Sequence, residues 1–81
     1  MNILNDEYFQ TSDFALVTTL SLNFKILKTE KDSNSRITFL FENSEELSGF
    51  IEKYWRGEVL IKPIEYFNQL KVIKTLIYSK K

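Results

Sequence analysis

An alternating apolar stretch that passes directly into a helix pattern constrains this fold most, and it occupies residues 36–57. In residues 36–41 apolar side chains recur at every second position, which is typical of a strand with one buried face. Asn43 is followed three residues later by Glu46, and this spacing predicts a capping box at the start of a helix. The stretch therefore predicts a strand that leads at once into a helix.

The helix predicted from residue 43 has a single apolar face. Its apolar side chains recur at i, i+3, i+4, i+7 and i+8, the spacing of a buried stripe, and they are Leu47, Phe50, Ile51, Tyr54 and Trp55. Gly57 follows as the expected end of the helix, because glycine adopts the left-handed conformation without strain. We therefore expect both Tyr54 and Trp55 to pack in the core.

Signals on either side of this stretch supply the remaining elements. Residues 11–13 provide N-cap side chains for an apolar helix that is expected to end at Asn23 in a left-handed conformation. Residues 24–28 are a strand candidate, joined to the following strand by a polar turn. The apolar triplet 59–61 is either a short third strand or a packed linker. Pro63 suits the first turn of a last helix.

These elements predict one small α+β domain over residues 1–81, in which residues 1–10 form an N-terminal arm. An antiparallel β-hairpin, or a three-stranded sheet if residues 59–61 join it, packs with three helices in the order α-β-β-α-(β)-α. A chain of 81 residues has room for a single core. Domains of this size commonly gain stability by self-association.

The last helix carries more apolar surface than one core contact needs. One stripe runs along it and consists of Ile64, Phe67, Leu70, Ile73 and Ile77. Further apolar side chains lie off this stripe and form a candidate interface, namely Tyr66, Val72, Leu76 and Tyr78. A homodimer that pairs the last helices is expected to cover them, since two-fold dimers are the commonest oligomers. The alternative is a monomer in which that surface is covered by the N-terminal arm, through Ile3, Leu4, Tyr8 and Phe9.

Charge is balanced overall but unevenly distributed. Residues 1–50 hold four basic and eight acidic residues, and residues 51–81 hold seven basic and three acidic residues, so the halves carry −4 and +4. The basic half offers candidate contacts for an anion or a nucleic acid, namely Lys53, Arg56, Lys71 and Lys74. The sequence pI of about 6.2 is low for a protein that follows phosphates. A simpler interpretation is that the two halves neutralise each other in the fold or across a dimer.

The composition argues against catalysis. Histidine and cysteine are absent, which removes the usual proton shuttle at neutral pH, Ser-His-Asp and Cys-His sites, and zinc sites of the Cys/His type. The carboxylates within residues 6–13 and 42–46 lie where helices are predicted to begin, and capping and the helix dipole explain them without a metal. With two glycines the chain has no phosphate-binding loop. We therefore predict no catalytic residue, no cofactor and no metal.

No segment predicts a membrane span or a secretory signal. No run approaches 18 consecutive apolar residues, and the first residues lack a basic region followed by an apolar one. The absence of cysteine is compatible with a reducing compartment. We expect a soluble, cytoplasmic protein without a membrane partner.

Four short motifs resemble those of a family of small uncharacterised bacterial and phage proteins that is defined only as a domain of unknown function. They are a Phe-x-Thr-x-Asp entry, a first helix closed by Leu-Gly, a Phe-x-Phe strand and a Tyr-Trp-x-Gly helix end, matched here by residues 9–13, 22–23, 39–41 and 54–57. Asn23 stands where the family prefers Gly, and both residues accept a left-handed backbone. The resemblance implies no catalytic residue, cofactor or substrate, and it favours a mobile-element or host-interaction role.

The function expected from these features is a non-enzymatic protein-interaction module that self-associates, as an accessory protein of a phage or mobile element. The alternative is a small nucleic-acid-binding protein that uses the basic C-terminal half. A carboxylate-dependent metal enzyme is a third and weaker option.

Overall fold

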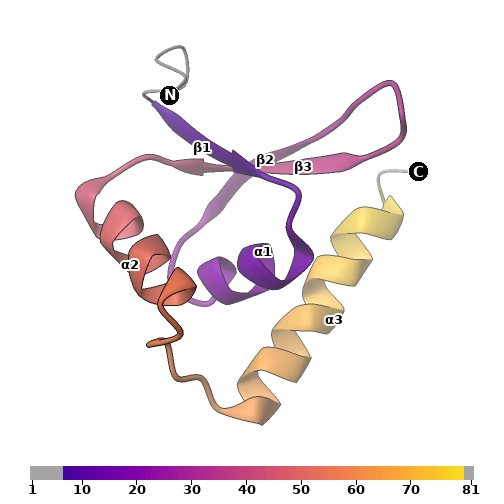
Figure 1. The fold of residues 1–81 in the computed structure, drawn as a ribbon. Coiled ribbons are helices and arrows are strands. Elements are labelled where there is room, and N and C mark those ends of the chain that lie inside the picture. The colour runs from indigo at the N-terminus through magenta and orange to yellow at the C-terminus, as the bar shows by residue number, and fades with distance from the viewer. Residues whose placement is uncertain (1–6, 80–81) are drawn as a thin grey trace.

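The computed structural model describes residues 7–79, which form a three-stranded antiparallel sheet and three helices (Figure 1). The strand order is β1-β3-β2, and the helices lie on one side of the sheet. The α+β fold expected from the sequence is confirmed. The elements in chain order are β1 (Tyr8–Thr11), α1 (Phe14–Ser21), β2 (Ile26–Lys31), β3 (Ile37–Glu42), α2 (Glu45–Trp55) and α3 (Pro63–Ser79).

The central strand β3 anchors the core. Phe39 and Phe41 alternate along β3 as the period-2 pattern predicted, and both are buried beneath the helices. Helix α1 lies nearest the centre and is buried along most of its length, because it has apolar or small side chains around most of its circumference. The remaining members of the buried cluster come from all three helices and are Leu16, Val17, Leu20, Leu47 and Ile73.

The third strand is not where the sequence pattern suggested. Residues 59–61 form no strand, and the third strand is β1, within residues assigned above to the arm and the helix cap. Strand β1 has only four residues, and it is defined by its partner, since Tyr8 pairs with Glu42 and Thr11 with Phe39. Such a short edge strand carries little pattern of its own. Of the two interpretations of residues 59–61, the packed linker is therefore the correct one.

The helix ends agree with the sequence in part. Asp13 caps α1, because its Oδ1 accepts a hydrogen bond from the Leu16 N–H at 3.0 Å. The cap of α2 is Ser44, whose Oγ accepts from the Leu47 N–H at 3.0 Å, and the prediction of Asn43 is wrong. The reason is that the Asn43 N–H still donates to the Glu7 carbonyl, at 3.0 Å, and so extends the strand pairing by one residue.

The two polar turns also differ from expectation. Asn23 is not left-handed, because α1 ends in a tight right-handed turn in which the Asn23 and Phe24 N–H groups both donate to the Leu20 carbonyl. In the hairpin, β2 continues to Lys31, and the turn closes around Asp32, whose Oδ1 accepts from the N–H groups of Asn34 and Arg36. The expected polar turn is therefore shorter, because β2 extends to Lys31 and the Asp32 side chain closes the remainder.

Candidate functional site

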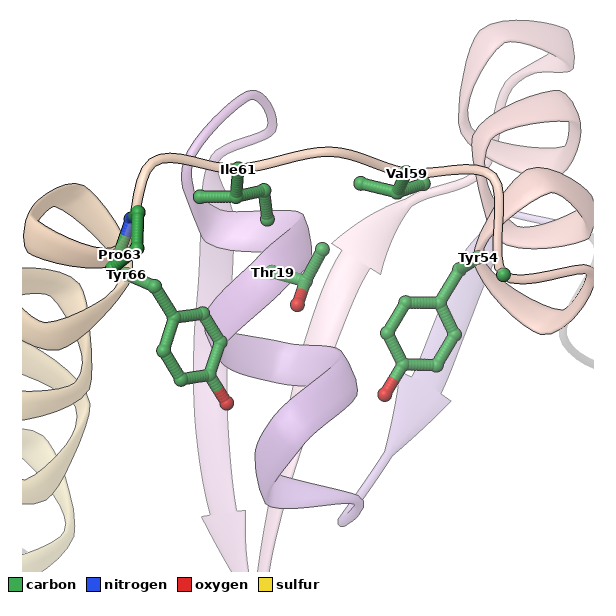
Figure 2. Close-up of a pocket in the computed structure, with 7 residues that line it drawn as sticks. Thr19, Tyr54, Val59, Ile61, Pro63 and Tyr66 are labelled. Atoms are coloured by element: carbon green, nitrogen blue, oxygen red, sulfur yellow. The ribbon is translucent and has the colours of Figure 1, made fainter.

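A pocket opens where the C-terminal end of α2, the linker to α3 and the first turn of α3 meet over α1 (Figure 2). Its volume is about 360 Å³, near the lower limit for small-molecule sites. Thr19 of α1 lies between the two tyrosines that flank the pocket (Figure 2). The lining residues are Thr19, Tyr54, Gly57, Val59, Ile61, Pro63 and Tyr66.

The end of α2 fixes the direction in which the linker leaves the helix. Gly57 has a φ of +74°, and its N–H donates to the Tyr54 carbonyl at 3.0 Å. The Glu58 N–H donates to the Lys53 carbonyl at 2.9 Å, which completes the Schellman motif typical of glycine-terminated helices. The predicted stop at Gly57 is confirmed, and it sends the chain back across α1.

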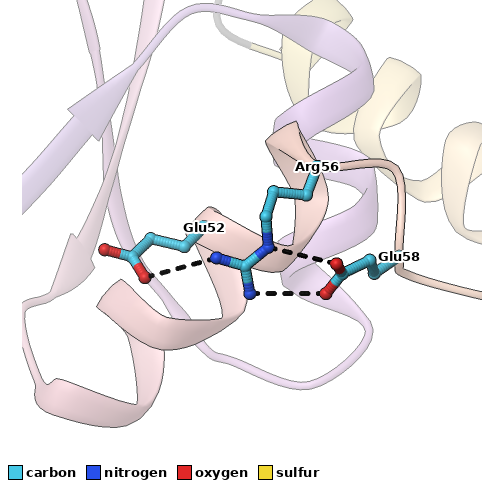
Figure 3. Close-up of polar contacts among 3 residues, drawn as sticks. All are labelled: Glu52, Arg56 and Glu58. Atoms are coloured by element: carbon cyan, nitrogen blue, oxygen red, sulfur yellow. Dashed lines mark hydrogen bonds and ion pairs between the residues drawn. The ribbon is translucent and has the colours of Figure 1, made fainter.

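The Arg56 side chain contacts residues on both sides of this turn (Figure 3). Its Nε and one terminal nitrogen donate to the two carboxylate oxygens of Glu58 at 3.2 and 3.3 Å, in the bidentate geometry that suits a guanidinium group. The other terminal nitrogen lies 3.9 Å from Glu52, one turn earlier in α2. Arg56 therefore joins the helix to the first residue after Gly57 and is neutralised by two carboxylates.

The linker alternates its side chains like a strand without a partner. Val59 and Ile61 line the pocket, whereas Leu60 between them is 94% exposed. No backbone hydrogen bond is formed by residues 59–61 with any other part of residues 7–79. Their period of two explains why the sequence resembled a strand, although it builds a pocket wall instead.

Two phenol groups supply most of the polar chemistry of the pocket. The hydroxyls of Tyr54 and Tyr66 extend from opposite sides toward the same end of the pocket (Figure 2). Neither hydroxyl has a hydrogen-bond partner among residues 7–79, whereas the Thr19 hydroxyl donates to the Ala15 carbonyl at 2.9 Å. Burial, the Asp13 charge and Tyr66 together raise the pKa of Tyr54 above 10.0, so its hydroxyl is protonated at neutral pH.

A second feature is an outer face on α3, which we define as Ile64, Phe67, Lys71, Thr75 and Tyr78. Helical geometry places these five positions on one side of α3, and the exposed fractions are 64% for Ile64, 52% for Phe67 and 64% for Tyr78. The Lys71 ammonium lies 4.7 Å from the centre of the Phe67 ring, which is cation–π distance. Outside α3, the exposed large apolar side chains are Tyr8, Phe14, Leu27, Trp55 and Leu60, of which Leu60 and Trp55 are the most exposed.

The buried side of α3 differs from the apolar stripe predicted from the sequence. Ile64 and Phe67 were expected to be buried and are exposed, while Ile73 is fully buried as predicted. Helix α3 packs against α1, and a polar residue, Gln69, faces inward, where its side-chain amide donates to Ser21 Oγ at 2.9 Å. The apolar spacing alone did not reveal that a glutamine lies on the buried side.

The four candidate interface residues are therefore divided among three environments. Tyr66 lines the pocket, and Leu76 packs against the buried cluster. Val72 and Tyr78 are 49% and 64% exposed. Tyr78 is the one of the four that lies on the outer face.

Trp55 is exposed, which contradicts its assignment to the core. It is the last residue of α2, its side chain is 65% exposed, and its ring lies edge-on to that of Tyr54 with centres 4.9 Å apart. Tyr54 itself is half-buried and packs against the core. The buried stripe of α2 thus ends one residue earlier than the sequence indicated.

Of the four candidate basic residues, Lys53 lies on α2, Arg56 is the C-cap residue of α2, and Lys71 and Lys74 lie on α3. Lys53 and Lys74 are exposed. Arg56 is held by Glu52 and Glu58, and Lys71 lies over Phe67. Among residues 7–79 no three acidic side chains come close enough together to hold a metal ion.

The fold and the site define a small α+β protein with a helix-covered antiparallel sheet and an uncharged pocket beside an exposed apolar helix face. A family model for a domain of unknown function, DUF5659, matches residues 6–79, and the chain belongs to this family. No curated protein and no solved structure matches the chain. Within the described residues, no helix has the length and apolar character to cross a membrane.

Proposed function

We propose that the protein is a non-enzymatic interaction module that self-associates through the outer face of α3. The observation that carries this proposal is the exposure of Ile64, Phe67 and Tyr78 on one side of a single helix. Large apolar side chains gathered on one face of a small protein commonly mark an interaction surface. In Figure 1 this helix lies at the edge of the molecule with one side open.

The outer face is complementary to itself in an antiparallel pairing. Ile64 and Tyr78 lie seven residues to either side of Lys71, and Phe67 and Thr75 lie four residues to either side. A two-fold axis at Lys71 therefore brings Ile64 of one copy against Tyr78 of the other, and Phe67 against Thr75. Such an isologous contact closes on itself and gives a dimer.

The two Lys71 side chains, which meet at the centre of this pairing, do not repel each other strongly. Each ammonium is directed along its own helix toward the ring of Phe67, one turn closer to the N-terminus. In an antiparallel pair the two ammonium groups consequently point away from each other. The aliphatic part of each lysine side chain then covers apolar surface at the axis, as long basic side chains commonly do.

Light scattering at several concentrations tests the proposal. The wild-type chain is expected to reach twice its mass of 9.6 kDa, and Phe67→Glu is expected to remain monomeric because it buries a charge in the contact. The matched control is Ser48→Glu, which adds the same charge at an exposed position of α2. A wild-type chain that stays monomeric at millimolar concentration would contradict the proposal, and so would a Phe67→Glu dimer as stable as wild type.

Nucleic-acid binding is a second candidate, favoured by one observation. Lys71 and Lys74 lie on the same helix as two exposed rings, Phe67 and Tyr78, and single-strand binders combine cations and stacking rings in this way. Binding to a single-stranded oligonucleotide is expected to weaken steeply as salt rises. Lys71→Gln with Lys74→Gln should reduce that salt dependence. No binding at about 50 mM salt would remove this candidate.

The proposed accessory role rests on the family resemblance, and the proposed location rests on the sequence features described above. We assign the module to the cytoplasm, as an accessory protein of a phage or mobile element. The identity of neighbouring genes tests this assignment. Placement among ordinary metabolic genes in most genomes that encode the family would argue against it.

A further inference from the structure

We propose that the pocket between α2, the linker and α3 binds a neutral organic ligand that ends in a carboxamide, with its apolar part against Val59 and Ile61. This site is separate from the outer face of α3 and does not depend on the proposed self-association. The proposal rests on the two phenol groups, on the uncharged lining and on the way the pocket is built.

The phenol groups of Tyr54 and Tyr66 are available to a ligand. Both hydroxyls are directed toward the same end of the pocket (Figure 2), and neither is used by another group among residues 7–79. A carbonyl oxygen has two lone pairs and accepts two hydrogen bonds. An amide oxygen therefore has an acceptor site for each of the two phenol protons.

The surroundings select against a charged ligand. All seven lining residues are uncharged, so an anion or a cation would lose its hydration without gaining a counter-charge. An anion is further disfavoured by the negative charge of Asp13, which acts on Tyr54. The N–H₂ group of a carboxamide tolerates that charge, because it is a donor. A neutral amide therefore matches both the phenols and the field around them.

The pocket wall is set before any ligand arrives. The Schellman turn at Gly57 and the bidentate contact of Arg56 with Glu58 hold the start of the linker. Val59 and Ile61 then supply an aliphatic surface opposite Thr19. Preorganised walls reduce the entropy lost on binding. At about 360 Å³ the pocket suits a ring or short chain with one polar end.

Benzamide, benzoate and benzylamine are matched probes, since they share a ring and differ in charge. Titration of each probe into ¹⁵N- and methyl-labelled protein should give shifts at Val59 and Ile61 with benzamide, with a dissociation constant on the order of millimolar for so small a ligand. Benzoate and benzylamine should bind at least about tenfold more weakly. Benzoate or benzylamine binding as tightly as benzamide would overturn the neutral-amide assignment.

Conservative tyrosine variants test the role of the hydroxyls. Tyr54→Phe and Tyr66→Phe keep the rings and should each weaken benzamide binding about tenfold, because the bound carbonyl loses one donor. Tyr8→Phe is the control, since Tyr8 lies on β1 outside the pocket. Circular dichroism checks that all three variants fold. Unchanged affinity in both pocket variants, or benzamide shifts that lie elsewhere on the protein, would refute the site.

This test is independent of the dimer test. Phe67→Glu is expected to abolish self-association and leave benzamide binding unchanged, because Phe67 does not line the pocket. Failure of benzamide to shift any pocket residue at about 10 mM would refute the site while leaving self-association intact.

Discussion

Two isoleucines on the same helix offer a direct test of how α3 packs. Ile73 is fully buried in the cluster formed with α1 and β3, whereas Ile64 is 64% exposed on the outer face. The same substitution, isoleucine to alanine, removes the same atoms at both positions. The comparison therefore isolates burial from side-chain chemistry and helix propensity.

The expected costs differ several-fold. Ile73→Ala removes a fully buried side chain and leaves a cavity, which typically costs about 2–5 kcal/mol. Ile64→Ala removes a side chain that has lost only about a third of its surface to burial, worth roughly 0.5–1 kcal/mol. The better helix propensity of alanine offsets a few tenths of this, so the net cost should be about 0.5 kcal/mol or less.

Urea unfolding followed by circular dichroism measures both free energies. A domain of this size has a total stability of about 4–12 kcal/mol, so Ile73→Val, expected to cost about 0.5–1.5 kcal/mol, serves as a milder variant if Ile73→Ala does not fold. The measurements should be made at two protein concentrations, since a dimer contact at Ile64 would add a concentration-dependent cost. Equal losses of stability at the two positions in the dilute sample, or a larger loss for Ile64→Ala, would refute the assignment of Ile73 to the buried side of α3 and of Ile64 to its outer face.

Four further substitutions follow from the structure. Trp55→Ala should cost less than about 1 kcal/mol, because the side chain is 65% exposed, and a loss of about 3–5 kcal/mol on urea unfolding would place the ring in the core after all. Gly49→Ala should raise the midpoint of urea unfolding and stabilise by about 1 kcal/mol, because the position is helical and nothing lies within 4 Å of the added carbon; a loss of stability would contradict this open environment. Ser44→Ala should cost about 1 kcal/mol on urea unfolding, and unchanged stability would contradict the assignment of Ser44 as the cap. The folded-state pKa of Tyr54 is raised above 10.0, so its contribution to stability is fully present below that pH and is lost as pH rises through the folded-state pKa. Wild type should therefore lose more stability than Tyr54→Phe between neutral pH and about pH 11. Parallel pH profiles of stability for the two proteins would contradict the raised pKa.

The parts of the fold that local chemistry determines were predictable from the sequence. The alternation of residues 36–41 predicted strand β3, residues 11–13 predicted the cap of α1, which is Asp13, and Gly57 predicted the end of α2. Each of these depends on contacts within a few residues, so a single segment carries the whole signal. The α+β class follows from the same local elements.

The errors arise where distant residues decide the outcome. Strand β1 exists because β3 offers an edge to it, and Ser44 replaces Asn43 as the cap because Glu7 pairs with Asn43. Likewise, the buried side of α3 includes Gln69, which is satisfied by Ser21 of α1, far away in sequence. An apolar count along one helix cannot register a partner on another. The same limitation explains why the pocket was missed, since its lining comes from three separate segments.

The linker connects the two candidate surfaces, and its geometry explains why they lie side by side. An extended backbone sends successive side chains to opposite sides. Val59 and Ile61 therefore complete the pocket, and Leu60 is left outside at 94% exposure, next to the start of α3. Residues 59–61 pair with no strand among residues 7–79, and the contact of Arg56 with Glu58 lies at the start of this segment. Residues 59–61 thus supply a wall of the pocket through Val59 and Ile61, and an exposed apolar side chain, Leu60, near the start of α3.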